Sequence, residues 1–176
     1  EYGALAAGDV MELPDLFRVI RKRGIYMQEA YPQGGAMTAV LGLDGNIVAK
    51  VCEQTAKETG NVVSVANYNC PGQIVITGEA DAVAAASENL KEAGAKRCVP
   101  LKVSGPFHSA LLKTAGEQLA EELQGVKISS PWIPYLSNVT ADYVTNASQV
   151  TELLEQQVST PVHFTQSVER MIADGV

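Results

Sequence analysis

Residues 36–45 read Ala-Met-Thr-Ala-Val-Leu-Gly-Leu-Asp-Gly, an apolar run that ends in an Asp-Gly turn. A second apolar run over 73–78 also ends in a turn that contains an aspartate, Asp81. Each run is followed by a helical pattern that closes near a glycine, Gly60 or Gly94, as helix C-termini prefer. Working outward, the pattern predicts, in order, strand 36–43, helix 45–59, strand 62–68, strand 73–78, helix 81–93 and strand 96–104. This β-α-β-β-α-β order predicts a ferredoxin-like α/β subdomain.

The turn between the two middle strands is Asn69-Cys70-Pro71-Gly72, which we expect to lie outside regular strand. The flanking sequence predicts one buried strand and four helices: strand 131–139 and helices 13–31, 110–124, 148–157 and 165–174. The flanks hold too little sheet for an α/β core of their own. We therefore expect 34–103 to be a small subdomain inserted between 1–33 and 104–176 of a larger one, and sequence to be missing at one or both ends.

The helix predicted over 13–31 carries one arginine that needs a partner. Its apolar residues recur at helical spacing and predict a buried stripe: Leu13, Leu16, Phe17, Ile20 and Met27. Arg18 and Lys22 lie opposite this stripe, whereas Arg23 lies on its flank. Because arginine keeps its proton, a partly buried one requires an anion. That anion is either an internal carboxylate or a bound ligand, and both remain open here.

Composition narrows the class of protein. The chain has 176 residues, 46% hydrophobic and 19% charged, with a net charge of −7. This charge disfavours a general nucleic-acid or anionic-membrane surface, and no apolar run is long enough to cross a membrane. The three cysteines lack CxxC spacing, which argues against a disulfide framework or a zinc site. We expect a cytoplasmic protein without a metal or other cofactor.

The strongest local candidate for chemistry is His108. Gly105-Pro106 breaks the strand-like alternation before it, and Ser109 opens a helical pattern after it. A helix N-terminus carries partial positive charge, so it biases an imidazole toward the neutral form that a general base needs. The alternative is a packed or solvent-facing histidine in a turn.

Several motifs, in order, resemble one enzyme family. They are EYGALAAG (1–8), Arg23-Gly24 with MQEA (27–30), ANYNCPGQ (66–73), VSGPFHS (103–109), SNVT (137–140) and PVHFTQSV (161–168). Together they resemble the malonyl-CoA:acyl carrier protein transacylases of fatty acid synthesis, with acyltransferase domains of polyketide synthases close behind. The resemblance covers essentially the whole chain, and it implies an α/β-hydrolase-like fold for the larger subdomain.

The resemblance implies a ping-pong transfer of a malonyl group from coenzyme A to the phosphopantetheine thiol of an acyl carrier protein through a seryl-enzyme. His108 would be the base, oriented by the backbone carbonyl of Gln157 in place of an acidic residue. Arg23 would bind the malonyl carboxylate with its bidentate fork. Met27 would line the acyl pocket, and Asn69 would contact the acyl group or brace the site. Core packing and turn formation are the alternatives for these last two.

The resemblance also indicates which catalytic residue lies outside this chain and which acyl group the enzyme would prefer. The family's nucleophile serine would precede Glu1, so we expect 1–176 alone to be inactive. Phe107 before the histidine matches the malonyl-selective pattern of the family and would crowd a 2-methyl branch.

An acidic carrier protein would require a local basic patch on this acidic chain, and Lys96, Arg97 and Lys102 are the candidates. The alternative is that these basic residues lie on a solvated strand edge and discourage aggregation there.

Two other classes of protein compete with this interpretation. A ferredoxin-like subdomain is also typical of non-catalytic ligand-binding modules, in which His108 and Arg23 would be structural. A cysteine enzyme would use Cys70 or Cys98 as its nucleophile with His108 as base. Cys98 and Cys52 fall among apolar residues and are expected to be buried, which disfavours this class.

Overall fold

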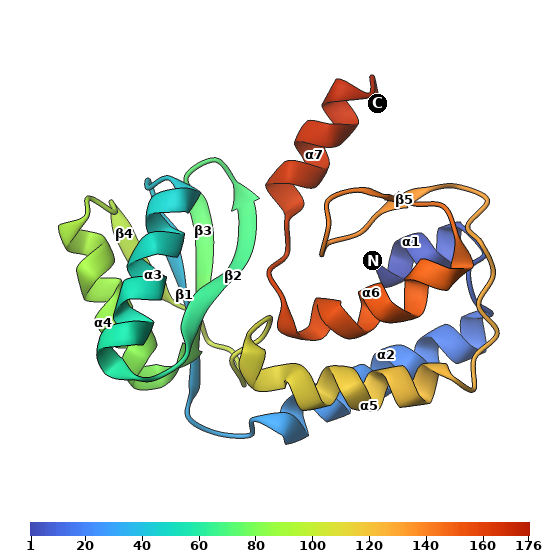
Figure 1. The fold of residues 1–176 in the computed structure, drawn as a ribbon, viewed down its shortest axis with the longest axis horizontal. Helices are drawn as coiled ribbons and strands as arrows, with labels where there is room; N and C mark the ends of the chain where they lie inside the picture. Colours follow the sequence, from blue (N-terminus) through green and yellow to red (C-terminus); the bar gives the residue numbers. More distant parts are fainter.

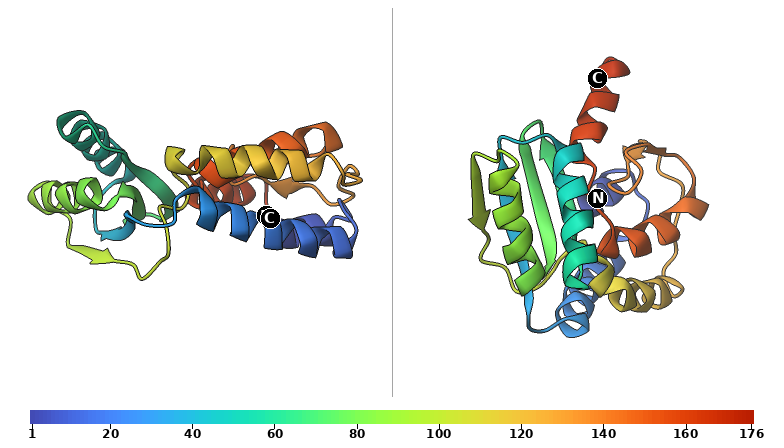
Figure 2. Two further views of the ribbon diagram at one scale, coloured as in Figure 1. Left: turned by 90° about the horizontal axis from the view of Figure 1, so that it is seen from below. Right: turned by 60° about the vertical axis from the view of Figure 1, so that its left-hand side comes forward.

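The computed structural model describes residues 1–176 and has two lobes, one built on a sheet and one on helices (Figure 1). The sheet has four antiparallel strands in the order β2-β3-β1-β4. Their bounds are β1 Gly35–Leu41, β2 Val63–Cys70, β3 Gln73–Glu79 and β4 Arg97–Pro100. Helices α3 (Gly45–Thr59) and α4 (Ala80–Glu92) cover one face of it (Figure 2). The β-α-β-β-α-β order and the ferredoxin-like fold predicted from the sequence are confirmed.

Local signals in the sequence explain where α3 begins and ends. The Asp44 side chain accepts a hydrogen bond from the Asn46 amide at 2.9 Å and so caps the first turn. Gly60 closes the helix with φ +71°, a conformation that glycine adopts without strain. Between these ends the helix buries Val48 and Cys52 against the sheet.

Two predicted boundaries in this lobe are wrong. Asn69 and Cys70 belong to β2, because a tight turn at Pro71-Gly72 lets Cys70 pair with Gln73. The strand predicted over 96–104 is paired only at 97–100. Beyond Leu101, whose amide donates to the Met37 carbonyl at 2.9 Å, the chain leaves the sheet edge and crosses to the helical lobe.

The second lobe is helical, with one short β-ribbon. Its elements are α1 Tyr2–Ala7, α2 Leu13–Ala30, the 3₁₀ turn η1 Ala110–Leu112, α5 Lys113–Leu123, β5 Tyr135–Leu136, β6 Tyr143–Val144 and α6 Ala147–Ser159. A last helix, α7 (Phe164–Ala173), extends away from both lobes in Figure 1. The buried strand predicted over 131–139 is wrong, since only 135–136 pairs and Trp132 is 68% exposed. Pro131 and Pro134 have no N–H to donate to a ladder, which restricts pairing there.

Only two of the five residues predicted for the buried stripe on α2 are buried. Leu16 and Met27 are buried together with Val19, in the core shared with α1 and α5. Phe17 is 67% exposed, and Leu13 and Ile20 are exposed as well. Burial depends on which side of the helix the neighbouring elements occupy, and α1 and α5 cover the side that carries Val19.

The two lobes have separate hydrophobic cores and are joined along the edge strand β2. The Val162 amide donates to the Ala66 carbonyl at 2.8 Å, and the Tyr68 amide donates to the Val162 carbonyl at 2.9 Å. The His163 ring stacks on Tyr68 with centroids 5.2 Å apart. The segment after α6 is therefore held against the sheet. The exact subdomain boundaries, 1–33, 34–103 and 104–176, stay a prediction.

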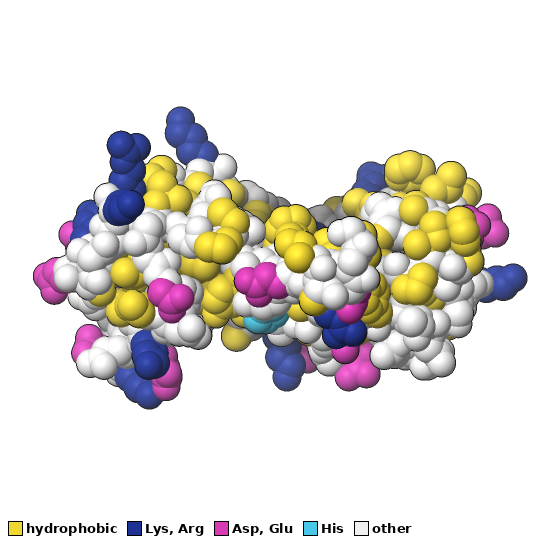
Figure 3. Space-filling view, turned by 90° about the horizontal axis from the view of Figure 1, so that it is seen from above, with side chains coloured by type: hydrophobic (Ala, Val, Ile, Leu, Met, Phe, Trp, Pro, Cys, Tyr) yellow, Lys and Arg dark blue, Asp and Glu magenta, His cyan; other side chains and the backbone are white.

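The space-filling view shows the same two lobes with a hollow between them on one face (Figure 3). Hydrophobic side chains are visible at the surface of both lobes. No helix of the chain has the length and hydropathy required to cross a membrane.

Candidate active site

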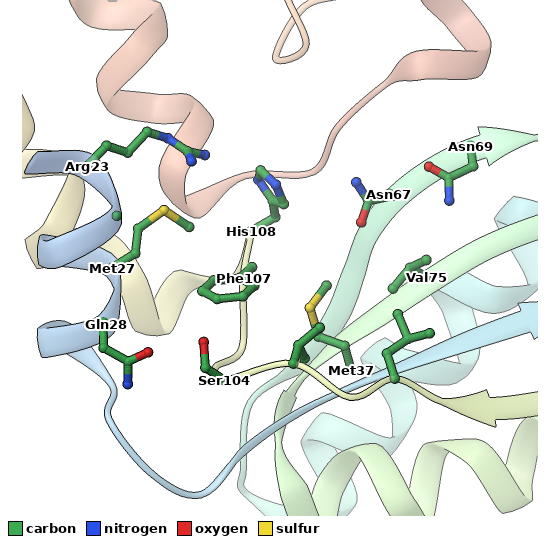
Figure 4. A pocket seen from close by; sticks show the side chains of 13 residues that line it. Arg23, Met27, Gln28, Met37, Asn67, Asn69, Val75, Ser104, Phe107 and His108 are labelled. Carbon is green, nitrogen blue, oxygen red and sulfur yellow. The ribbon is translucent and has the colours of Figure 1, made fainter. Parts of the chain in front are cut away.

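A cavity of about 530 Å³ lies between α2 and the uncovered face of the sheet (Figure 4). Three kinds of segment supply its walls: helix α2, strands β1 to β3, and the loop that follows β4. The lining side chains that the following argument uses are Arg23, Met27, Met37, Asn67, Asn69, Val75, Phe107 and His108. The cavity is thus formed where the two lobes meet.

Strand alternation explains which sheet residues face this cavity. Val75 lies between Ile74 and Ile76, which belong to the core under α3 and α4, so it points to the opposite face. Asn67 pairs with Val75 and therefore shares that face. A register irregularity between Val65 and Asn67 makes this placement hard to predict from the spacing alone.

His108 is held in an unusual backbone conformation, with φ +58°. The Ser109 hydroxyl stabilises this turn by donating to the Pro106 carbonyl at 2.7 Å. The His108 Nδ1 lies 2.9 Å from the Gln157 carbonyl oxygen. A carbonyl only accepts hydrogen bonds, so Nδ1 carries the proton and Nε2 is left with a lone pair.

The pKa of His108 is lowered from its ordinary value of 6.5, chiefly by burial and additionally by the positive charge of Arg23. From the sequence we expect the same bias toward the neutral form but attribute it to the helix N-terminus, whereas burial is the main cause of the lowered pKa in the structure. The imidazole is therefore neutral near pH 7, as a general base must be.

The Gln157 carbonyl is available because of the residue four positions later. In a helix that carbonyl would accept from the amide of residue 161, but residue 161 is a proline and has no N–H. The contact with His108 satisfies the orphaned oxygen. The resemblance implies this contact between His108 and the Gln157 carbonyl, and the orienting role of Gln157 stays a prediction.

Arg23 is half-buried and has no carboxylate partner. Its Nη2 donates to the Gln157 side-chain oxygen at 2.8 Å, and its Nε is buried without a partner. No aspartate or glutamate lies within 4.0 Å of its guanidinium. Burial lowers the pKa of Arg23, yet an arginine remains charged at neutral pH. Of the two partners left open by the sequence, the internal ion pair is not formed.

The remaining residues predicted for the site, Met27, Asn69 and Phe107, all line the cavity. In Figure 4 Met27 and Phe107 lie near His108, while Asn67 and Asn69 project from β2 on the other side. The sequence analysis missed Met37, Asn67 and Val75. For Met37 and Val75, strand alternation is the signal that identifies them once the helix-covered face is known, whereas the irregular register of β2 hides Asn67.

The cysteines do not contribute to this cavity. Burial raises the pKa of Cys52 to about 12, and it raises the pKa of half-buried Cys98 as well. Cys70 is exposed at the end of β2. A thiol with a raised pKa is a poor nucleophile, so the geometry does not favour a cysteine enzyme. The chain also holds no cluster of three or more His, Cys, Asp or Glu side chains suited to a metal ion.

Comparison with known proteins agrees with this geometry. The family model described as acyl transferase domain matches residues 1–176. A malonyl CoA-acyl carrier protein transacylase of Bacillus subtilis is 48% identical over the whole chain, which spans 56% of that protein's length. The crystal structure of an acyl carrier protein S-malonyltransferase from Vibrio cholerae is 42% identical, with a TM-score of 0.97 over 100% of this chain and 57% of that one.

A third relative is seen with its partner. The structure of a type II polyketide synthase acyl carrier protein in complex with its malonyl-transacylase matches with 40% identity and a TM-score of 0.95, over 99% of this chain and 56% of that one. The chain thus spans little more than half the length of these relatives. Because the family model matches it from end to end, the chain belongs to the acyl transferase domain family.

Proposed function

We propose that the full-length protein is a malonyl-CoA:acyl carrier protein transacylase. The observation that carries the proposal is that Gln157 contacts both a neutral imidazole and a guanidinium that forms no ion pair. An acyl transfer needs the imidazole as base, and a dicarboxylic acyl group needs the guanidinium as counter-ion. The two relatives are named a malonyl CoA-acyl carrier protein transacylase and an acyl carrier protein S-malonyltransferase, which supports the same assignment.

In the first half-reaction a serine contributed by residues outside 1–176 loses its proton to His108 Nε2. Its oxygen forms a bond to the thioester carbonyl carbon of malonyl-CoA. The tetrahedral intermediate then breaks the carbon–sulfur bond, and the departing thiolate takes the proton from the imidazolium. No hydroxyl of residues 1–176 is hydrogen-bonded to the His108 ring, which supports a nucleophile from elsewhere in the protein.

The second half-reaction uses the same base in the opposite sense. The phosphopantetheine thiol of the carrier protein gives its proton to Nε2 and its sulfur bonds to the seryl ester carbonyl. The carbon–oxygen bond breaks, and serine recovers the proton. The Gln157 carbonyl keeps Nδ1 protonated throughout, so one nitrogen performs both transfers.

The walls of the cavity fit a short acyl group without a branch at its 2-position. Arg23 lies at the helical end of the cavity, and its Nη1 has no hydrogen bond and can donate to the malonyl carboxylate. Met27 and Phe107 supply apolar surface around the acyl chain, and the Phe107 ring beside the base disfavours a 2-methyl branch. Asn69 with Asn67 supplies amides on the opposite wall, where they can bind polar groups of the substrate.

The test is transfer itself. Full-length protein incubated with malonyl-CoA should form a covalent malonyl ester detectable by mass spectrometry, and it should release the malonyl group to holo acyl carrier protein. Failure to form an adduct, with the protein folded, would exclude the proposed function.

The pH dependence should reflect the lowered pKa of His108. Transfer requires the neutral imidazole, so kcat/KM for malonyl-CoA should fall as the pH falls through that pKa. Because burial and Arg23 lower the pKa, the midpoint should lie below 6.5. Initial rates measured between about pH 4.5 and 8, an interval that brackets the ordinary pKa of histidine, give this midpoint. A midpoint at or above 6.5 would contradict the neutral buried base.

The carrier protein is expected at the basic candidates near the end of the sheet. Lys96, Arg97 and Lys102 are all exposed, and none of them lies within 4.0 Å of a carboxylate. Arg97 opens the edge strand β4, and the segment from Leu101 to Ser104 runs from it along the cavity. A negative partner docked here would have its prosthetic arm close to the cavity.

Reversing the charges of Lys96 and Arg97 to glutamate should raise KM for the carrier protein by about tenfold and leave KM for malonyl-CoA nearly unchanged. The defect should shrink at high salt, since exposed charges are screened. Lys50→Glu with Lys127→Glu is the matched control, because both lysines are exposed and the change in net charge is the same. Equal effects on KM for both substrates would contradict a docking surface here and would favour the alternative that these charges only protect a strand edge from aggregation.

Two alternatives are less favoured. A non-catalytic binding module does not account for His108 and Arg23, which lie outside the sheet lobe yet meet at one cavity. An acyltransferase domain of a polyketide synthase would use the same chemistry. The Bacillus subtilis and Vibrio cholerae relatives are named as transferases of acyl carrier protein, which favours the first proposal.

A further inference from the structure

We infer that the side-chain amide of Gln157 determines selectivity for a carboxylate-bearing acyl group, by orienting Arg23 without neutralising it. The inference rests on the proposed function. It concerns the side chain of Gln157, which is a positioning group, and is separate from the orienting role of its backbone carbonyl. Gln157 is only 6% exposed, so its amide must have partners within the protein.

Those partners fix which way the amide points. Its oxygen accepts from Arg23 Nη2 at 2.8 Å, and its nitrogen donates to the Asn138 side-chain oxygen at 3.2 Å. The backbone of Asn138 is itself held, because its N–H donates to the Glu1 carboxylate at 2.9 Å and its carbonyl oxygen accepts from the backbone N–H of His163 at 2.9 Å. Rotating the Gln157 amide by half a turn would place donors against Arg23 and break both hydrogen bonds.

Whether the guanidinium of Arg23 is neutralised depends on whether the side chain at position 157 is charged. A carboxylate in this position would form an ion pair, and the paired guanidinium would attract an acyl carboxylate much less. A neutral amide oxygen orients the same group and adds no negative charge to it. Nη2 is hydrogen-bonded and Nε is buried without a partner, whereas Nη1 has no hydrogen bond and is not buried, so its donors are free for a ligand.

The same residue also reaches the base. The Gln157 carbonyl holds His108 through Nδ1, while its side chain holds Arg23. Substituting the side chain leaves that carbonyl in place. Effects on acyl selectivity can therefore be separated from effects on the acid–base step.

The decisive variant is Gln157→Glu in the full-length protein, because glutamate has the same shape and can still accept from Arg23. We expect kcat/KM for malonyl transfer to fall about 100-fold, the scale of a desolvated charge pair, with acetyl transfer changed less than about threefold. Gln157→Met, which keeps the volume and the backbone carbonyl, should lose about tenfold for malonyl-CoA, mainly in KM. Rates are measured near pH 8, where the imidazole is neutral in each variant.

Gln156→Glu is the matched control. It adds the same charge on the neighbouring residue, whose side chain bonds Glu152 on the outside of α6. Selectivity should not change in this variant.

Arg23→Ala separates failure of the inference from failure of the function. If Arg23→Ala abolishes the preference for malonyl but Gln157→Glu retains it, the inference is overturned and the proposed function stands. If Arg23→Ala retains the preference, the proposed clamp itself is wrong. Equal losses of malonyl and acetyl transfer in Gln157→Glu, with a lower Tm, would show a structural role only and also overturn the inference.

Discussion

His108→Ala in the full-length protein is expected to reduce malonyl transfer by at least about 1,000-fold, because the nucleophile and the carrier thiol both lose their base. The fold should persist, since the side chain lines a cavity and belongs to neither hydrophobic core. Single-turnover formation of the malonyl ester, followed by transfer to the carrier protein, measures both halves of the reaction. Circular dichroism and a thermal melt check the fold.

The second histidine of the chain provides the control. His163 stacks on Tyr68 and does not line the cavity, so His163→Phe keeps the stack and should keep transfer close to the wild-type rate. If His108→Ala retained more than a tenth of wild-type transfer, the role assigned to His108 would be wrong.

Arg23→Ala is expected to invert acyl selectivity. The guanidinium contributes to binding a malonyl carboxylate but has nothing to pair with in an acetyl group. Truncating one member of such a charge pair costs about 2–5 kcal/mol, or roughly 30-fold to several thousand-fold in malonyl transfer. Acetyl transfer should be retained or improve. The measurement is kcat/KM for malonyl-CoA and acetyl-CoA with the same carrier protein.

Arg23→Lys should recover only part of the loss, because an ammonium cannot form two parallel hydrogen bonds with a carboxylate. Arg18→Ala is the control on the same helix: its side chain pairs with Asp15 and Glu122 away from the cavity, so selectivity should not change. A parallel loss of both acyl activities in Arg23→Ala, with a lowered Tm, would mean that Arg23 is a structural residue.

The local sequence pattern was enough to predict the order of elements in the sheet lobe and the place of His108 on a turn. Strand alternation and helical spacing are local properties, and capping signals such as Asp44 and Gly60 lie within a few residues of the ends they define. The interruption at Gly105-Pro106 likewise placed His108 on a turn. Several short motifs in order were enough to indicate the family.

Strand ends and helix faces depended on more than the local pattern. The apolar run over 131–139 forms little strand because two prolines interrupt it, and Phe17 is exposed because no element lies over its side of α2. Asn67 reaches the cavity through an irregular register that spacing did not reveal.

The surroundings of Arg23 depend on how distant parts of the chain pack together. The arginine and Gln157 are 134 positions apart, and the carbonyl that contacts the His108 ring is 49 positions from it. Sequence could establish that a partly buried arginine needs an anion, because its charge is an intrinsic property. It could not exclude an internal carboxylate, since the neighbours of a buried group are set by how the two lobes pack. That packing leaves Arg23 with a neutral partner and an open cavity in front of it.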